Sequence, residues 1–321
     1  MLLKRLTKTF IIILICLVAL FVLAFGGLNL LKFEIYKDYY NIKQNVCTNP
    51  GLSDGFICQG ICAYEGETDD VLDDRILVSG YMKNGSASRI YVTDVENNAY
   101  YITLKDTVGN EFNGHAGGIA VNGSIAYVAD GGYILQVDLN DILNAENGDM
   151  LLIQKQTEVN NAASFIYAND DYLYVGEFHN GKQYITNHPF ETPDGTNHAI
   201  VSRYSYSDLE HPNAIYSIPN KVQGFCVSPK GDIALSTSYG LASSYYYVYT
   251  NDDIIDSNLT IDGAPVYFLT NCKKAIKGPA MAEGLDYYNE RVITLTESAS
   301  NKYIFGKFFF ANKIVSLDLF S

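Results

Sequence analysis

The 321-residue sequence has no tryptophan, only 8 prolines and only 18% charged residues. With 48% hydrophobic residues, this composition excludes a disordered or collagen-like chain. Tyrosine and phenylalanine are abundant instead, with 26 and 16 copies. Aromatic and β-branched side chains pack well on a pleated surface. The composition therefore favours an all-β fold over a helical bundle.

Basic residues are also scarce, and the net charge is −14. Three of them, Lys4, Arg5 and Lys8, lie within residues 1–31, which hold no acidic residue. Residues 32–321 therefore hold 19 basic and 36 acidic residues, a net charge of −17. Such a surface repels phosphate backbones and anionic headgroups, and its basic residues are scattered along the sequence. We expect no nucleic-acid partner.

One long uncharged run, Phe10 to Leu31, lies near the N-terminus. Its 22 residues span roughly 30 Å as a helix, the thickness of a bilayer core. Because the three cations precede it, residues 1–9 are expected to be a cytoplasmic tail and residues 10–31 a transmembrane signal anchor. The chain would then be a single-pass protein of the cell membrane with its C-terminal domain outside. The alternative is secretion after signal-peptide cleavage near Val22-Leu23-Ala24.

Of the six cysteines, Cys16 lies within this run and five lie outside it. An extracytoplasmic setting permits up to two disulfides with one thiol left over, and the spacing leaves their pairing open. The Cys58 and Cys62 spacing resembles half of a metal site but has no second pair, so a structural role is favoured. The five outer cysteines are Cys47, Cys58, Cys62, Cys226 and Cys272.

A pattern of short strands recurs five times after Cys58. Each repeat begins with a residue pair that is small or polar, followed by an apolar strand. The starts are separated by 58, 46, 60 and 60 residues, and second strands follow over residues 75–82, 125–130, 172–178, 233–239 and 291–298. The starts read Gln59-Gly60-Ile61-Cys62, Gly117-Gly118-Ile119-Ala120, Ala163-Ser164-Phe165-Ile166, Gln223-Gly224-Phe225-Cys226 and Glu283-Gly284-Leu285-Asp286.

Radial repetition of such units predicts a β-propeller of five blades over residues 55–321. Six blades remain open, since the length divided by roughly 45 residues per blade gives about six. A β-sandwich is the weaker alternative. Fourth strands are read as YYITL, LLIQKQ, AIYSI and PVYFL, and the last repeat ends before one. Residues 32–54 form a connector, in which Phe33 to Val46 could supply that closing strand.

The repeat starts QGIC, GGIA, QGFC and EGLDY resemble the inner strands of extracytoplasmic propellers in the gluconolactonase, strictosidine-synthase-like and phytase-like grouping. The resemblance covers about residues 55 to 319. It implies a calcium ion in the central tunnel, with a glutamate beside a glycine as one ligand. Glu283 beside Gly284 matches that feature and is the candidate metal ligand.

By analogy with other propellers, the loops that lead into inner strands and the loops after second strands share one face. The expected ligand-binding residues at this funnel are Gln59, His115, Asp130, Glu177, His179, Gln223 and Glu297. Clustered carboxylates would raise each other's pKa or bind a hard cation such as Ca²⁺. The alternative is that they are solvated turn acids.

The third repeat carries an insertion, Asn180 to His198, with several histidines in or near it. A loop of this length is often functional, and Phe178, Tyr184 and Phe190 could make it a lid for a sugar or aromatic ligand. The histidine spacings match no short zinc motif, so solvated histidines are the default interpretation. The histidines are His179, His188, His198 and His211.

GxSxG, Walker and GxGxxG motifs are absent from the sequence. Two functions remain. The first is a membrane-anchored propeller that binds a small molecule, glycan or envelope protein at its funnel. The second is a calcium-dependent hydrolase or lactonase with Glu283 as metal ligand and His115 as catalytic base.

Overall fold

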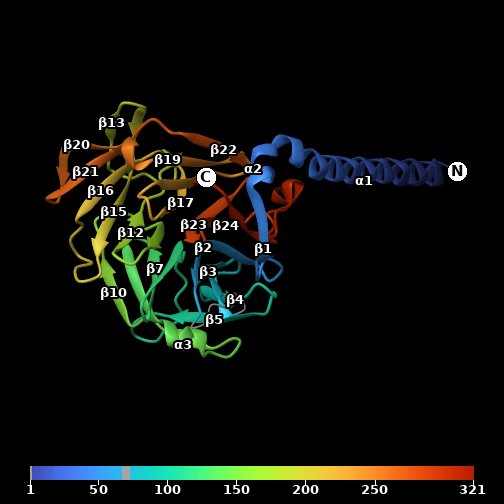
Figure 1. The fold of residues 1–321 in the computed structure, drawn as a ribbon. Coiled ribbons are helices and arrows are strands. Elements are labelled where there is room, and N and C mark those ends of the chain that lie inside the picture. The colour runs from blue at the N-terminus through green and yellow to red at the C-terminus, as the bar shows by residue number, and fades with distance from the viewer. Residues whose placement is uncertain (1, 67–72) are drawn as a thin grey trace.

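A computed structural model describes residues 2–66 and 73–321. Five sheets of four to six strands surround a central axis (Figure 1). The first strand of each repeat contacts that of the next, in the order β2, β6, β11, β17, β23 and back to β2. The five-bladed propeller expected from the repeats is thus confirmed.

The first two blades contain the following strands. Blade one comprises β2 (Phe56–Tyr64), β3 (Arg75–Met82), β4 (Arg89–Thr93), β5 (Ala99–Lys105) and β9 (Met150–Leu152). Blade two comprises β6 (Gly118–Asn122), β7 (Ile125–Asp130), β8 (Tyr133–Asp138) and β10 (Lys155–Glu158), and the helix α3 (Leu139–Leu143) follows β8.

The other three blades continue the ring. Blade three has β11 (Phe165–Ala168), β12 (Tyr172–Gly176), β15 (Ala199–Ser205), β16 (Ala214–Ile218), β21 (Ala264–Leu269) and β20 (Ile254–Ile261). Blade four has β17 (Val222–Val227), β18 (Ile233–Thr237), β19 (Ser244–Tyr249) and β22 (Lys274–Gly278), with η2 (Asn251–Asp253) after β19. Blade five has β23 (Ala282–Tyr288), β24 (Arg291–Thr296), β25 (Lys313–Leu317) and β1 (Lys43–Thr48), with η3 (Phe305–Phe309) between β24 and β25.

The ring is closed by β1, which is the outer strand of the last blade. It pairs antiparallel with β25, so that Lys43 lies opposite Leu317 and Thr48 opposite Lys313. The sequence placed this strand within Phe33 to Val46, but most of that stretch is helical. Residues Lys37–Ile42 form α2, whose buried Tyr39 stacks on Tyr246 of blade four at 6.0 Å.

Two expected fourth strands belong elsewhere. The PVYFL segment is β21, which pairs in parallel with β16 of blade three, and the outer strand of blade four is β22. The LLIQKQ segment is divided, because β9 pairs with β5 of blade one and β10 with β8 of blade two. Alternation of apolar residues specifies a strand and its buried face, but not which sheet edge it joins.

Close approach of the inner strands explains the glycines at the repeat starts. A Cβ on Gly60 would lie 2.5 Å from the Cα of Gly118, and one on Gly118 would lie 2.5 Å from the backbone nitrogen of Ile166. On the other side of the ring, a Cβ on Gly224 would lie 2.6 Å from the nitrogen of Leu285. Only glycine leaves enough room where backbones approach this closely.

The N-terminal helix α1 (Leu2–Ile35) extends away from the propeller (Figure 1). Its segment Thr7–Ile35 is 29 residues long, enough to cross a membrane, and the most apolar 18 residues within it have a mean hydropathy of 3.1 and are not buried by the rest of the chain. This length and composition fit either a signal anchor or a signal peptide.

All six cysteines are free thiols, so neither of the two disulfides allowed for by the sequence is formed. Cys47, Cys58, Cys62 and Cys226 are buried, and burial raises the pKa of each thiol, to about 12 for Cys47. Buried thiols with raised pKa values are chemically inert. They act as small core residues.

Candidate functional site

Polar side chains of the first and last blades meet where inner strands of the propeller begin. Glu297, directly after β24, accepts hydrogen bonds from the Gln59 Nε2 of β2 at 3.2 Å and from the Tyr303 hydroxyl at 3.1 Å. Gln59 and Glu297 are both buried. The inner strand β2 of blade one is thus hydrogen-bonded, through Gln59, to the glutamate that follows the second strand β24 of blade five.

Glu283 of β23 forms a similar pair with Gln223 of β17, whose Nε2 donates to Glu283 Oε1 at 3.4 Å. Gln59, Gln223 and Glu283 all sit where the pairing register of an inner strand shifts. Such a bulge places an extra residue in one strand and re-aims its side chain. The bulge therefore lets these side chains point in a direction that the regular in-and-out alternation of a strand would not allow.

The two glutamates form an electrostatic pair. Burial raises the pKa of Glu283 well above its ordinary value, and the negative charge of Glu297 raises it further. Burial also raises the pKa of Glu297 against the opposing effects of Tyr303, Lys302 and Gln59. Two buried carboxyl groups that repel one another retain a proton at neutral pH. The pair can both donate and accept hydrogen bonds.

Replacing Glu283 by Gln should flatten the dependence of stability on pH. Because its pKa in the folded state exceeds 4.5, the acid contributes fully to stability below that pH. This contribution is lost as the pH rises through the folded-state pKa. We expect the melting temperature of wild type to fall as the pH rises above 4.5, and that of Glu283→Gln to fall less.

The exposed turn acid Glu290 offers a matched control. Glu290→Gln should follow the wild-type melting profile across the same pH range. Parallel profiles for wild type and Glu283→Gln would contradict the assignment of a retained proton to the glutamate pair.

A pair of adjacent rings continues this site into blade two. The ammonium of Lys302 bonds to the Tyr81 hydroxyl and lies 4.7 Å from the centre of its ring. The His115 ring lies 4.4 Å from the Tyr81 ring, and desolvation lowers the pKa of His115. Asp130, whose pKa is raised by desolvation, accepts a hydrogen bond from the Ala116 backbone at 2.9 Å. His115 remains exposed to water.

We call this connected group the funnel-mouth cluster. It unites six of the residues expected from the sequence and adds three that were not singled out as ligand contacts. The added residues lie on β3 or in the long loop between β24 and β25, and the length of that loop was the available signal. The nine members are Gln59, Tyr81, His115, Asp130, Gln223, Glu283, Glu297, Lys302 and Tyr303.

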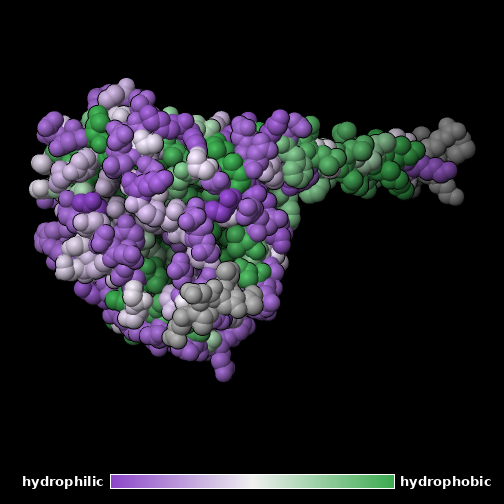
Figure 2. All heavy atoms as spheres, viewed as in Figure 1, coloured by the Kyte–Doolittle hydropathy of each residue, from purple (hydrophilic) through white to green (hydrophobic). Residues whose placement is uncertain are grey.

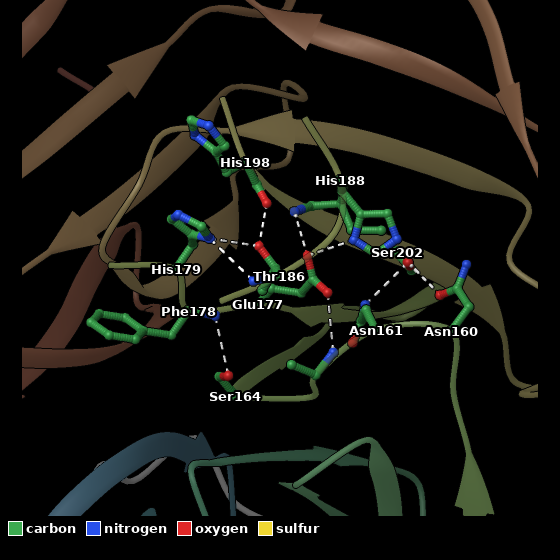
Figure 3. A network of polar contacts seen from close by, with 12 residues as sticks. Asn160, Asn161, Ser164, Glu177, Phe178, His179, Thr186, His188, His198 and Ser202 are labelled. Carbon is green, nitrogen blue, oxygen red and sulfur yellow. Dashed lines mark hydrogen bonds and ion pairs between the residues drawn. The ribbon is translucent and has the colours of Figure 1, made fainter. Parts of the chain in front are cut away.

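Glu177 belongs to a different network, which fixes the insertion of blade three (Figure 3). Its carboxylate accepts from the backbone nitrogens of Ala162 and Ile200, each at 3.2 Å. The Nδ1 of His188 lies 2.9 Å from Glu177 Oε2. These contacts join the insertion to the loop that leads into β11 and to the start of β15.

His179 lies in the same network (Figure 3). Its Nδ1 is 2.9 Å from Thr186 Oγ1, its ring stacks on His198 at 4.7 Å, and desolvation followed by the charge of His198 lowers its pKa. The insertion ends in the hairpin β13 (Phe190–Thr192) and β14 (Gly195–Asn197), and Phe190 packs on Phe268 of β21. His211 pairs separately with exposed Asp208.

The donor set of the funnel-mouth cluster does not fit a calcium site. Across residues 2–66 and 73–321, no three His, Cys, Asp or Glu side chains are grouped so that they could hold a metal ion. Calcium takes about 6–8 oxygen ligands, and the cluster offers a glutamate pair with two carboxamides. The charge of Lys302 beside Glu297 also opposes a cation.

These blades and their central cluster define the chain as a β-propeller protein. No protein-family profile matches it, and no curated protein matches it in sequence.

Among solved structures, the PQQ-bound aldose sugar dehydrogenase of Streptomyces coelicolor is 11% identical, with a TM-score of 0.43 over 79% of this chain and 77% of that one. BamB of Moraxella catarrhalis is 10% identical, with a TM-score of 0.31 over 86% and 95%. Hydrazine synthase of Kuenenia stuttgartiensis is 10% identical, with a TM-score of 0.36 over 73% of this chain, which spans 59% of that protein's length.

Proposed function

We propose that this protein is a membrane-anchored propeller that binds a small hydroxyl-rich ligand, such as a sugar, at its funnel mouth on the outer side of the membrane. The observation that carries the proposal is the funnel-mouth cluster itself. Side chains from blades one, two, four and five converge there, although they are far apart in the sequence. Core packing alone gives no reason to gather so many polar groups, since buried polar groups cost free energy unless they are paired.

The chemistry of the cluster suits sugar hydroxyls. The Glu283 and Glu297 pair and the carboxamides of Gln59 and Gln223 provide both donors and acceptors. Because the glutamate pair retains a proton, a cationic ligand is not needed to balance two negative charges. The adjacent rings of Tyr81 and His115 add an apolar surface beside these polar groups. Small-molecule sites combine such surfaces with a few placed polar groups.

Contacts between α1 and the propeller support a retained anchor. Asn29 donates to the Lys307 carbonyl at 3.3 Å and accepts from the Phe310 nitrogen at 3.2 Å. Lys32 donates to the Phe310 carbonyl at 2.7 Å. The ring of Phe21, which precedes the candidate cleavage site, packs on Phe308 at 5.6 Å. The helix therefore makes contacts that cleavage after Ala24 would partly remove.

Thermal shift with a panel of monosaccharides and oligosaccharides tests the ligand. A binding sugar at 100 times its Kd should stabilise the wild type by about 2.7 kcal/mol. Tyr81→Leu and Lys302→Gln should reduce this stabilisation, because they remove the stacking surface and a donor. Asp208→Asn, an exposed control outside the cluster, should respond as wild type does. A panel without any shift, or variants that bind like wild type, would contradict a sugar site.

A hydrolase is the second candidate, and His115 is the observation that favours it. Its ring is exposed to water, desolvation lowers its pKa, and the charge of Asp130 lies close enough to act on it. A neutral imidazole of this kind can accept a proton from water. Ester, lactone and phosphoester hydrolysis by wild type that is lost in His115→Ala would favour the enzyme over a binding protein.

A further inference from the structure

The loop between β24 and β25 exposes large apolar side chains. Ile304 is 72% exposed, Phe305 is 62% exposed and Phe310 is 37% exposed. The first two are adjacent in the chain, and all three flank or belong to η3. We call residues Ile304–Phe310 the η3 loop. Neighbouring exposed apolar residues of this size mark an interaction surface more often than scattered ones do.

This apolar surface is continuous with the membrane helix. Phe308 of the η3 loop packs on Phe21 at 5.6 Å and on Phe25 at 6.0 Å. Both helix residues lie inside the uncharged run that ends at Leu31. At 1.5 Å per residue, Phe21 lies about 15 Å before that end, a distance comparable to one leaflet of the hydrocarbon core. Figure 2 shows the apolar side chains of α1 meeting the domain at the base of the helix.

Several lysines lie around the same region, although the basic residues are scattered along the sequence. Lys83 and Lys307 both bond to Asn301, and Lys32 bonds to the Phe310 carbonyl. Burial, followed by the charges of Lys32 and Lys313, lowers the pKa of Lys43. With Lys302, this makes six of the 19 basic residues that residues 32–321 contain. A local basic group beside an apolar surface suits anionic phospholipids.

We propose that the apolar side chains of the η3 loop insert into the outer leaflet beside α1. Lys307 of the loop, which bonds back to Asn301, would then lie at the phospholipid headgroups with Lys32, Lys43, Lys83 and Lys313. The proposal rests on the anchoring part of the proposed function. We choose lipid hydrocarbon as the partner of this surface because the loop packs directly on α1, and the apolar surface of α1 itself requires a hydrocarbon environment.

Insertion would also place the funnel mouth close to the membrane surface. Lys302 and Tyr303 directly precede the η3 loop, and they contact Tyr81 and Glu297 of the funnel-mouth cluster. About one turn of chain thus separates groups in the lipid from groups that would contact the ligand. Access to the site would then be from the layer of water next to the headgroups.

Because the chain has no tryptophan, a single introduced tryptophan reports its own environment. The full-length variants Phe305→Trp and Ile304→Trp would be reconstituted in vesicles of phosphatidylcholine and phosphatidylglycerol, with and without brominated acyl chains. We expect blue-shifted emission that bromine strongly quenches. Tyr184→Trp, at a side chain that is 50% exposed in the insertion of blade three, is the matched control and should be neither shifted nor quenched.

Flotation of the same vesicles reports the anchor independently. Full-length protein that floats, with quenched emission from both η3 loop variants, supports the proposal. Protein that floats but shows the same unquenched emission in all three variants overturns insertion of the loop while the anchor stands. Protein that does not float overturns the anchor and the insertion together. The sugar-binding test in detergent depends on neither result.

Discussion

Removal of residues 1–48 should abolish the cooperative unfolding of the propeller, whereas removal of residues 1–35 should preserve it. The longer deletion removes β1 and leaves β25 as an unpaired edge. Each lost backbone hydrogen bond costs about 0.5–1.5 kcal/mol, and β1 pairs along five positions of β25. The longer deletion also removes the buried Cys47 side chain from the hydrophobic core. Circular dichroism during heating measures the difference.

The shorter deletion is the matched control because it keeps α2 and β1. Tyr36 and Tyr39, which are 3% and 2% exposed, remain docked on the domain. Its melting transition should coincide with that of the full-length chain in detergent. If the protein without residues 1–48 melts at the same temperature and as sharply, β1 does not close the ring.

Gly60→Ala should destabilise the propeller by about 3 kcal/mol or more, the upper range for overpacking. The new Cβ would lie 2.5 Å from the Cα of Gly118 and the nitrogen of Ile119, both of which are backbone atoms. Backbone cannot move aside as the end of a flexible side chain can. Urea denaturation measures the loss as a lower midpoint with an unchanged slope.

Gly123→Ala, in the turn between β6 and β7, is the control for this substitution. A Cβ there meets nothing within 4 Å, although the backbone φ is +58°. The control should therefore cost only the strain of a left-handed backbone, about 1–2 kcal/mol. Equal losses in the two variants would mean that contact between neighbouring inner strands is not what requires glycine at position 60.

The repeat starts allowed the five blades to be predicted because one physical requirement recurs in each of them. Every inner strand must approach its neighbours closely, so four of the five starts carry a glycine (Gly60, Gly118, Gly224 and Gly284) and the third carries the small pair Ala163-Ser164. The pairing of β21 with β16 could not be predicted in the same way. Its apolar alternation would fit the outer edge of either blade three or blade four.

The candidate site was predicted in part for a related reason. Gln59, Gln223 and Glu283 occupy equivalent places at the repeat starts, so a shared position around the axis followed from the fold. Lys302 and Tyr303 lie in a loop that occurs in one repeat only, and no period points to them. Glu177 ends its strand as Glu297 does, but an insertion next to it supplies other partners.

The closing strand also sets an order of events during synthesis. β1 leaves the ribosome long before its partner β25, since Lys43 pairs with Leu317. Pairing across so much chain is slow, and a strand that waits for its partner is exposed to wrong partners. A helix that stays in the membrane just before β1 would hold the waiting strand where the rest of the chain emerges. β25 would then need to move only a short distance to pair with β1 and close the ring once the last blade has been synthesised.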